Sequence, residues 1–216
     1  MTQSMVDDVY RRMFSDSSQS FDLYEGTASS AAGTKIIYLS TDLIVGIHKA
    51  IEYEAGEAWQ VIFNSCGLRW GRKVATSFER ELRVAANRRI DALTVIEYKE
   101  MVESYFSHHG WGKLSMRMDG IESHGVLVAE LTDSVFRYAL PNVDTCVDQL
   151  IAGMLRGIFE SLAQAELDCL MIEERQAGSA PLCRFLISGP DRIRWGQSLV
   201  DEGKAYDEVY KEVLAS

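Results

Sequence analysis

The sequence has 216 residues, of which 47% are hydrophobic and 25% charged, a composition typical of a globular protein with a full hydrophobic core. A net charge of −10 and a pI of about 4.9 exclude nucleic acid as an expected partner, because phosphate binding needs a basic surface. No apolar run approaches the roughly 20 residues of a membrane-spanning helix and no secretory signal is recognisable, so we expect a cytoplasmic protein whose contact with membranes, if any, is peripheral.

The N-terminal half is expected to be mostly helical. Residues 5–14 predict one short helix, and residues 15–34, which are rich in Ser, Ala and Gly, predict a flexible arm. A β-branched run at 35–39 indicates a short strand. Apolar residues at helical spacing then predict helices over 43–55, 57–86 and 91–107.

The hydrophobic period changes after residue 110. Strands are expected at 111–118 and 126–132, and residues 135–140 are expected to extend the second strand. The remaining chain predicts a helix over 143–165, an antiparallel hairpin of 167–174 and 182–188 around Gly178 and Pro181, and helices over 190–200 and 205–214.

This order of elements predicts an α+β fold, in which an antiparallel sheet of about four strands packs against helices. We expect three parts along the chain. Residues 1–34 form an N-terminal helix and flexible arm, residues 35–189 form the main domain, and residues 190–216 form a C-terminal helical extension.

Two glycine pairs lie on the apolar faces of predicted helices. Gly67 and Gly71 are four residues apart in one helix, and Gly153 and Gly157 are four residues apart in another. This spacing removes the side chains from one helix face, so a flat ligand or another backbone can approach closely. Tight packing between helices, within one chain or between two copies, is the alternative to a ligand.

The candidate binding residues are mostly aromatic. Their bulk suits the walls of an apolar pocket, although aromatic residues at these spacings also form ordinary cores. His109, next to His108 at a helix end, would add a polar contact or an axial ligand, unless it only interacts with the last helix carbonyls. The candidate ligand-binding residues are Phe63, Cys66, Trp70, His109, Trp111 and Tyr138.

No catalytic residues are assigned, because the dinucleotide, phosphate-loop, zinc-protease and serine-hydrolase motifs are all missing from the sequence. The four cysteines are expected to be reduced. Three of them, with Glu173 or Glu174, are candidates for zinc ligation, or else are small buried hydrophobic residues; these cysteines are Cys146, Cys169 and Cys183.

Five motifs in a fixed order resemble the 4-vinyl reductase domain family, over about residues 43–188. They are Cys66-Gly67-x-x-Trp70-Gly71, Gly110-Trp111-Gly112-Lys113-Leu114, Val126-Leu127-Val128, Cys146 ahead of Gly153-x-x-x-Gly157, and Gly178 followed by Cys183-Arg184-Phe185. The resemblance implies an α+β fold shared with TRAPP tethering subunits, a homodimer, and a hydrophobic small molecule held between sheet and helices.

The resemblance also implies candidate ligands. Members of the family sense aromatic compounds in bacterial activators or are linked to bacteriochlorophyll vinyl reduction, so a tetrapyrrole is a candidate ligand here. The aromatic sensors hold a zinc ion with cysteines and a glutamate. Cys146 and Cys183 match that pattern, but Glu174 or Arg175 stands where the middle cysteine belongs, so the zinc pattern is incomplete.

We therefore expect a non-enzymatic binding protein for a hydrophobic small molecule, with a chlorophyll precursor or bilin as the specific candidate and a role in photosynthetic pigment handling or complex assembly. One alternative is a subunit of a vinyl reductase, which would need a partner as electron source because the chain has no nicotinamide or flavin fingerprint. The other alternative is a dimeric scaffold without a ligand.

Overall fold

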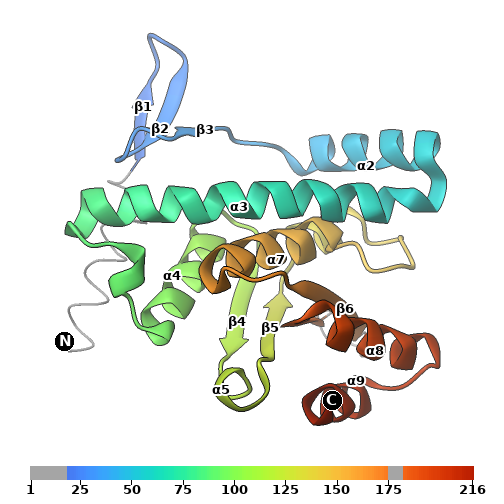
Figure 1. Cartoon of the computed structure of the whole chain (residues 1–216). Helices are drawn as coiled ribbons and strands as arrows, with labels where there is room; N and C mark the ends of the chain where they lie inside the picture. The colour runs from blue at the N-terminus through green and yellow to red at the C-terminus, as the bar shows by residue number, and fades with distance from the viewer. Residues whose placement is uncertain (1–18, 175–181) are drawn as a thin grey trace.

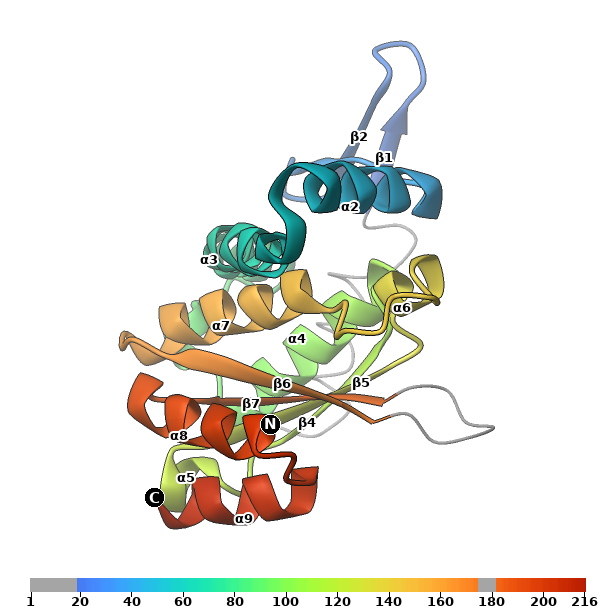
Figure 2. The same ribbon diagram turned by 90° about the vertical axis from the view of Figure 1, so that its right-hand side faces the viewer.

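The computed structural model describes residues 19–174 and 182–216. The helix expected at 5–14 and the turn expected around Gly178 lie outside the described residues, as do the side chains of Glu173 and Glu174. The described chain forms layers of helices and sheet that are stacked from α2 at one end to α9 at the other (Figures 1 and 2).

The central sheet has four antiparallel strands in the order β4-β5-β7-β6, which confirms the predicted α+β class. These strands are β4 (Lys113–Arg117), β5 (Leu127–Thr132), β6 (Asp168–Glu174) and β7 (Leu182–Ser188). In the register of the sheet, Ala129 lies opposite both Met116 and Phe185. Because side chains alternate along a strand, Leu114 and Met116 of β4 point inward while their neighbours are exposed.

Helices α4 (Val95–His108) and α7 (Gln149–Ala163) lie on one face of the sheet, and the long helix α3 (Trp59–Ala86) crosses the outer side of α7 (Figure 2). The resemblance places a ligand between sheet and helices. Side chains fill that layer in the structure: Met101, Leu131 and Phe185 are each 0% exposed. The layer therefore acts as a packed hydrophobic core.

Both glycine pairs serve the packing of α3 on α7. A β-carbon on Gly67 would lie 2.1 Å from the Leu150 carbonyl oxygen, and one on Gly153 would lie 2.0 Å from the Asn64 carbonyl oxygen. Gly71 and Gly157 are equally close to backbone atoms of the facing helix. The alternative of tight packing within one chain is thus correct, and these faces are open neither to a ligand nor to a second copy.

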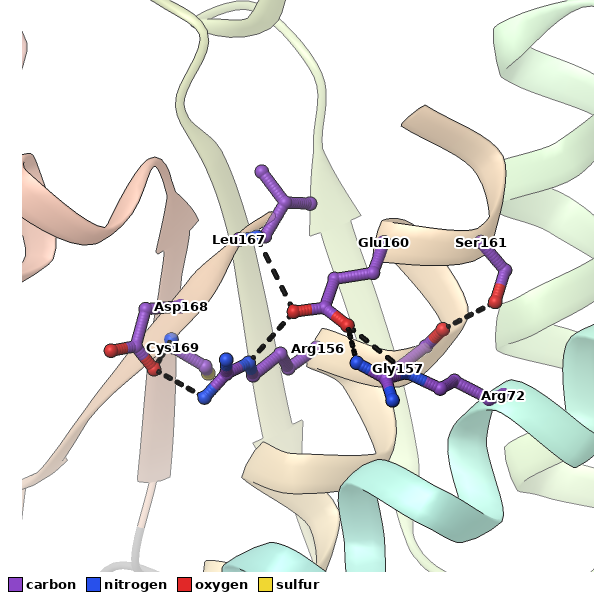
Figure 3. Close-up of polar contacts among 8 residues, drawn as sticks. All are labelled: Arg72, Arg156, Gly157, Glu160, Ser161, Leu167, Asp168 and Cys169. Carbon is purple, nitrogen blue, oxygen red and sulfur yellow. Dashed lines mark hydrogen bonds and ion pairs between the residues drawn. The ribbon is translucent and has the colours of Figure 1, made fainter. Parts of the chain in front are cut away.

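A chain of charged groups fastens the same helices to the sheet (Figure 3). Glu160 on α7 accepts hydrogen bonds from Arg72 of α3 at 2.7 Å and from Arg156 at 3.0 Å, and Arg156 also donates to Asp168 of β6 at 3.2 Å. Burial raises the pKa of Glu160, but bonds from the two arginines and the Leu167 amide lower it more, so the pKa lies below its ordinary value. Glu160 therefore remains ionised, and together with Arg156 it links α3, α7 and β6.

Helices α8 (Pro190–Asp201) and α9 (Tyr206–Ala215) confirm the predicted C-terminal helices and cover the second face of the sheet (Figures 1 and 2). Their apolar residues form a second core with outward-facing sheet residues. Its buried members are Val126, Val128, Leu170, Leu186, Ile193, Leu199, Tyr206, Val209 and Val213. The C-terminal extension therefore covers the face of the sheet opposite α4 and α7.

Two expected elements differ from the structure. Residues 135–140, expected as strand, contain helix α6 (Val135–Ala139), because Asp133 turns the chain with a φ of 54° and Ser134 Oγ accepts hydrogen bonds from the Phe136 and Arg137 amides. Residues 119–125, expected only as turns, contain the short helix α5 (Ile121–His124).

The N-terminal segment also differs from the expectation. Residues 19–30, expected as part of a flexible arm, form strands β1 (Gln19–Asp22) and β2 (Thr27–Ser30), and β2 also pairs with β3 (Lys35–Ile36). The left-handed glycines Gly26 and Gly33 supply the turns of this small antiparallel sheet. We call residues 19–36 the N-terminal hairpin. Helix α2 (Thr41–Ala55) follows and lies over the first half of α3 (Figure 1).

The junction between α3 and α4 depends on Glu97. Its carboxylate accepts a hydrogen bond from the Thr94 amide at 2.7 Å, and Thr94 Oγ1 accepts one from the Glu97 amide at 3.2 Å, which together form a capping box. Arg88, just beyond α3, donates to the same carboxylate at 2.8 Å. This last bond is the main cause that lowers the pKa of Glu97 to about 2.

We expect Glu97→Gln to lower the free energy of unfolding at pH 7 by about 2 kcal/mol. Because the folded-state pKa lies below 4.5, the stabilisation is present above that pH and is lost as the pH falls toward 2. Urea titrations of variant and wild type near pH 7 and near pH 3 measure whether the difference in their free energies of unfolding becomes smaller at the lower pH. Glu57→Gln, at an exposed position, should behave as wild type; a Glu97→Gln deficit independent of pH would contradict the assignment.

Candidate functional site

A pocket of about 420 Å³ lies between the N-terminal hairpin on one side and helices α3 and α4 on the other. This volume is within the range of small-molecule sites. We call it the hairpin pocket. Its lining residues are Gln19, Ser30, Thr34, Lys35, Ile36, Ile37, Trp70, Lys73, Val74, Ser77, Phe78, Glu81, Tyr105, His108, His109 and Trp111.

Helix α3 gives the pocket one wall with two rows of side chains. Residues three and four apart lie on the same helix face, so Trp70, Val74 and Phe78 form an apolar row. Lys73, Ser77 and Glu81, which also line the pocket, form a polar row beside it. The wall therefore offers both an apolar surface and separated polar groups to one occupant.

Aromatic rings form the floor of the pocket. The Trp70 and Trp111 rings meet edge to face, with centroids 5.0 Å apart and an interplanar angle of 61°. Trp111 also stacks on the buried Phe136 at 5.9 Å, and Tyr105 meets Phe78 at 5.2 Å. Such pairs stabilise each other beyond simple burial, so the floor is held in place without a ligand.

The local sequence Gly110-Trp111-Gly112 explains the position of Trp111. Gly110 ends helix α4 with a φ of 69°, and Gly112 has a φ of 129°, both accessible to glycine at little cost. A β-carbon on Gly112 would lie 2.8 Å from the Thr132 carbonyl oxygen. The two glycines thus let the chain turn sharply from helix to strand and leave the indole of Trp111 at the pocket.

The indole N–H of Trp111 is buried and has no hydrogen-bond partner among the described residues. Most buried polar groups in native proteins are paired, and an unpaired donor costs about 1–3 kcal/mol. Trp111 lines the hairpin pocket, although its Nε1 atom is itself covered by protein atoms.

His109 offers a hydrogen-bond acceptor, whereas Trp111 carries a donor. Its Nδ1 lies 2.9 Å from the Tyr105 carbonyl oxygen, which can only accept, so Nδ1 carries the proton. The ring packs on Tyr105 at 4.0 Å, and its partial burial there lowers the pKa of His109 below 6.5. The imidazole is therefore neutral at pH 7, with a lone pair on Nε2 that can accept a proton donor or ligate a metal.

Polar contacts hold the hairpin over the pocket. Glu81 Oε1 accepts hydrogen bonds from Ser30 at 2.5 Å and from Thr34 at 3.1 Å. Arg80 donates to the Thr34 hydroxyl, and Gln19 bonds to His108 Nε2 at 2.6 Å. The pocket wall formed by the hairpin is thus attached to the body chiefly through hydrogen bonds.

The structure brings together three of the six predicted site residues, namely Trp70, His109 and Trp111. Phe63 is 6% exposed and packs on Trp59. Cys66 is exposed on α3. Tyr138 is 77% exposed and lines a different hollow, beside Gly110 and Pro141.

Sequence reasoning did not assign the remaining lining residues to the site. On α3, the helical spacing from Trp70 would have found Lys73, Ser77 and Glu81. Tyr105 lies one helical turn before His109, so the same rule would have found it. No comparable signal marks Ser30 or Thr34, because their position depends on the hairpin.

No group of three or more His, Cys, Asp and Glu side chains could hold a metal ion within residues 19–172 and 182–216. In that part of the chain, Cys183 is buried and Cys146 is half-buried. Burial raises the pKa of the Cys169 thiol above its ordinary value, so this cysteine is a poor nucleophile. Every helix in the described ranges is too short or too polar to cross a bilayer.

Neither the protein-family comparison nor the comparison with curated proteins gives a match. Among solved structures, the phenol-responsive sensory domain of the transcription activator PoxR, crystallised with phenol, matches with a TM-score of 0.68 and 15% identity over 95% of this chain and 100% of that domain. The two proteins share a fold.

Two further solved structures are similar over most of the chain. A vinyl-4-reductase family protein from Methanocaldococcus jannaschii has a TM-score of 0.45 and 13% identity, over 71% of this chain and 83% of that one. A mutant H-NOX from T. tengcongensis has a TM-score of 0.44 and 13% identity, over 87% and 97% of the two chains. Membership of the 4-vinyl reductase domain family and the relation to TRAPP subunits remain predictions.

Proposed function

We propose that the chain is a binding protein without catalytic activity of its own, and that the hairpin pocket takes a flat, mostly apolar molecule with a polar substituent. The observation that carries the proposal is a pocket of about 420 Å³ whose floor is made of aromatic rings, among them the Trp70–Trp111 pair. Apolar walls with a few placed polar groups are characteristic of small-molecule sites.

The polar groups restrict what the ligand carries. The His109 imidazole has a lone pair for a donor or a metal. An aromatic hydroxyl provides that donor. The domain of the same fold that responds to phenol is in line with an aromatic ligand, and a cavity of about 150 Å³ already holds benzene, so this pocket has room for more than one ring.

A tetrapyrrole is the larger candidate of this class. It is flat and apolar, and the neutral His109 imidazole suits an axial position on the metal of a chlorophyll precursor. In this form of the proposal the protein handles pigments, or assembles pigment complexes, in the cytoplasm of a phototroph. The macrocycle is larger than the pocket, so part of it would have to lie outside.

We expect Ser77→Phe to abolish ligand binding, because the new ring would occupy the pocket from the α3 wall. The probes are 2-naphthol, biliverdin and magnesium protoporphyrin, each measured by melting temperature, with absorbance added for the pigments. A probe present at 100 times its dissociation constant stabilises the wild type by about 2.7 kcal/mol. Ser77→Phe should lose at least tenfold in affinity.

Thr76→Phe is the matched control, since Thr76 is exposed on the same helix and does not line the pocket. It should bind as the wild type does. Unchanged melting temperature and absorbance of the wild type with both pigments would reject the tetrapyrrole, and no response to any of the three probes would reject the binding function.

A homodimer is the second part of the proposal, and an exposed apolar surface supports it. Of the 17 large hydrophobic residues exposed in the described ranges, 11 lie between residues 21 and 62. We call these the N-terminal apolar surface: Phe21, Leu23, Tyr24, Ile37, Tyr38, Leu39, Leu43, Ile47, Tyr53, Val61 and Ile62. The hairpin and α2, which carry most of them, both lie on the outer side of α3, over its two ends (Figure 1).

The size of this surface suits a stable interface. One aromatic side chain buries about 150–250 Å², so these partly exposed residues together offer on the order of 1,000 Å², compared with about 800 Å² per partner in a standard interface. Patches of this size are uncommon on monomers. We therefore propose that α2 and the hairpin of two copies cover each other.

A further inference from the structure

Among the described residues that line the hairpin pocket, more carry positive than negative charge, although the whole chain has a net charge of −10. Lys35 of β3 and Lys73 of α3 both line it, whereas Glu81 is the one carboxylate among its lining residues. Neither lysine forms an ion pair with a described residue. His109 adds no charge, since burial keeps its imidazole neutral at pH 7.

Glu81 is already engaged at one end of the pocket. Its Oε1 accepts the Ser30 and Thr34 hydroxyls, and Arg80 reaches the same threonine. Lys73 lies eight residues before Glu81 on α3, which is about 12 Å along the helix axis. The end of this wall that carries Lys73, which we call the positive end, is therefore well separated from the Glu81 carboxylate.

The positive end coincides with the aromatic floor. Lys73 follows Trp70 by three residues, so both side chains lie on the same face of α3, and Trp70 contacts Trp111. One end of the pocket thus combines ring faces and an ammonium group.

We infer that the ligand of the hairpin pocket is an aromatic acid, with its ring against Trp70 and Trp111 and its carboxylate facing Lys73. This inference rests on the proposed binding function and specifies its ligand class. A carboxylate accepts hydrogen bonds only, and its charge neutralises the positive end. A neutral alcohol or amide of the same shape lacks that charge.

Three probes of nearly equal shape separate the possibilities: naphthalene-2-carboxylate, naphthalene-2-carboxamide, and the cationic 2-(aminomethyl)naphthalene. Affinities are measured by calorimetry and tryptophan fluorescence at pH 7, in low salt and in about 0.3 M salt. The acid should bind about fivefold tighter than the amide in low salt, since exposed ion pairs are weak. Salt should reduce this preference, because it screens exposed charges.

Lys73→Gln should reduce the preference for the acid over the amide to about twofold or less, because it should weaken binding of the acid more than binding of the amide. Lys49→Gln is the matched control, as Lys49 is an exposed lysine of α2 that does not line the pocket. It should keep the wild-type preference. Comparison of Lys73→Gln with Lys49→Gln distinguishes a contact between Lys73 and the ligand from the effect of the protein's net charge.

Three outcomes overturn the inference while the binding function stands. The first is an amide that binds as tightly as the acid, and the second is an ammonium probe that binds tightest, which would make Glu81 the deciding charge. The third is an acid preference that Lys73→Gln leaves intact. If none of these three probes binds while 2-naphthol or a pigment does, the aromatic acid is rejected and the binding function stands; if 2-naphthol and both pigments also fail, the proposed function itself fails.

Discussion

Gly153→Ala is expected to lower the free energy of unfolding by about 3 kcal/mol, although alanine is the better helix former. The added β-carbon would lie 2.0 Å from the Asn64 carbonyl oxygen. That oxygen belongs to the backbone of α3, so no side-chain rotation can move it. Helices α3 and α7 would have to separate, and the Glu160 contacts between them would be strained (Figure 3). Urea denaturation measures the loss.

Gly46→Ala is the matched control for this prediction. Gly46 lies within helix α2, and a β-carbon there meets no atom within 4 Å. The same substitution should therefore stabilise the protein, by about 0.5–1 kcal/mol. Equal effects at the two positions would show that helix propensity, and not the approach of two backbones, determines the result at Gly153.

The double variant Leu43→Glu, Ile47→Glu is expected to convert a dimer into a monomer. Both side chains belong to the N-terminal apolar surface, at 46% and 43% exposed, and lie one turn apart on α2. Two carboxylates buried against a second copy would lose their hydration without gaining partners, so association should weaken by at least a hundredfold. Sedimentation velocity over a range of concentrations measures it.

Circular dichroism should show that the double variant keeps its fold. The control is Leu162→Glu, at an exposed apolar position near the end of α7, which should leave the mass of the assembly unchanged. A wild type that stays monomeric at the highest concentrations would reject the dimer, and dissociation by Leu162→Glu would reject this surface as its interface.

The sequence was informative about the sheet and less so about what surrounds it. Strand patterns near Leu114, Val128 and Leu186 predicted four antiparallel strands correctly, because short runs that alternate or are continuously apolar, bounded by turn residues, are a strong local signal. The spacing of Gly67 and Gly153 predicted cleared helix faces, but not what covers them. That depends on a second helix whose glycines are in register, which is a property of the tertiary fold.

For the candidate site too, the sequence indicated residue types but not which residues meet in the fold. Trp70 and Trp111 were selected for their type, and their contact at 5.0 Å depends on how α3 lies relative to the end of α4. Tyr138 was selected by the same criterion, yet α6 directs it away from this pocket. Strands β1 and β2 of the hairpin had no sequence signal, because they are short, polar and rich in serine, without an apolar alternation.

The attachment of the hairpin links the interior of the protein to its assembly. Ser30 and Thr34 hold the hairpin to Glu81, while Phe21 and Tyr24 at its far end belong to the N-terminal apolar surface. If the pocket binds a ligand and two copies pair as proposed, a bound molecule would stiffen the hairpin and so reduce the entropy that dimerisation would have to remove. Ligand occupancy and self-association would then reinforce each other by the same factor in both directions.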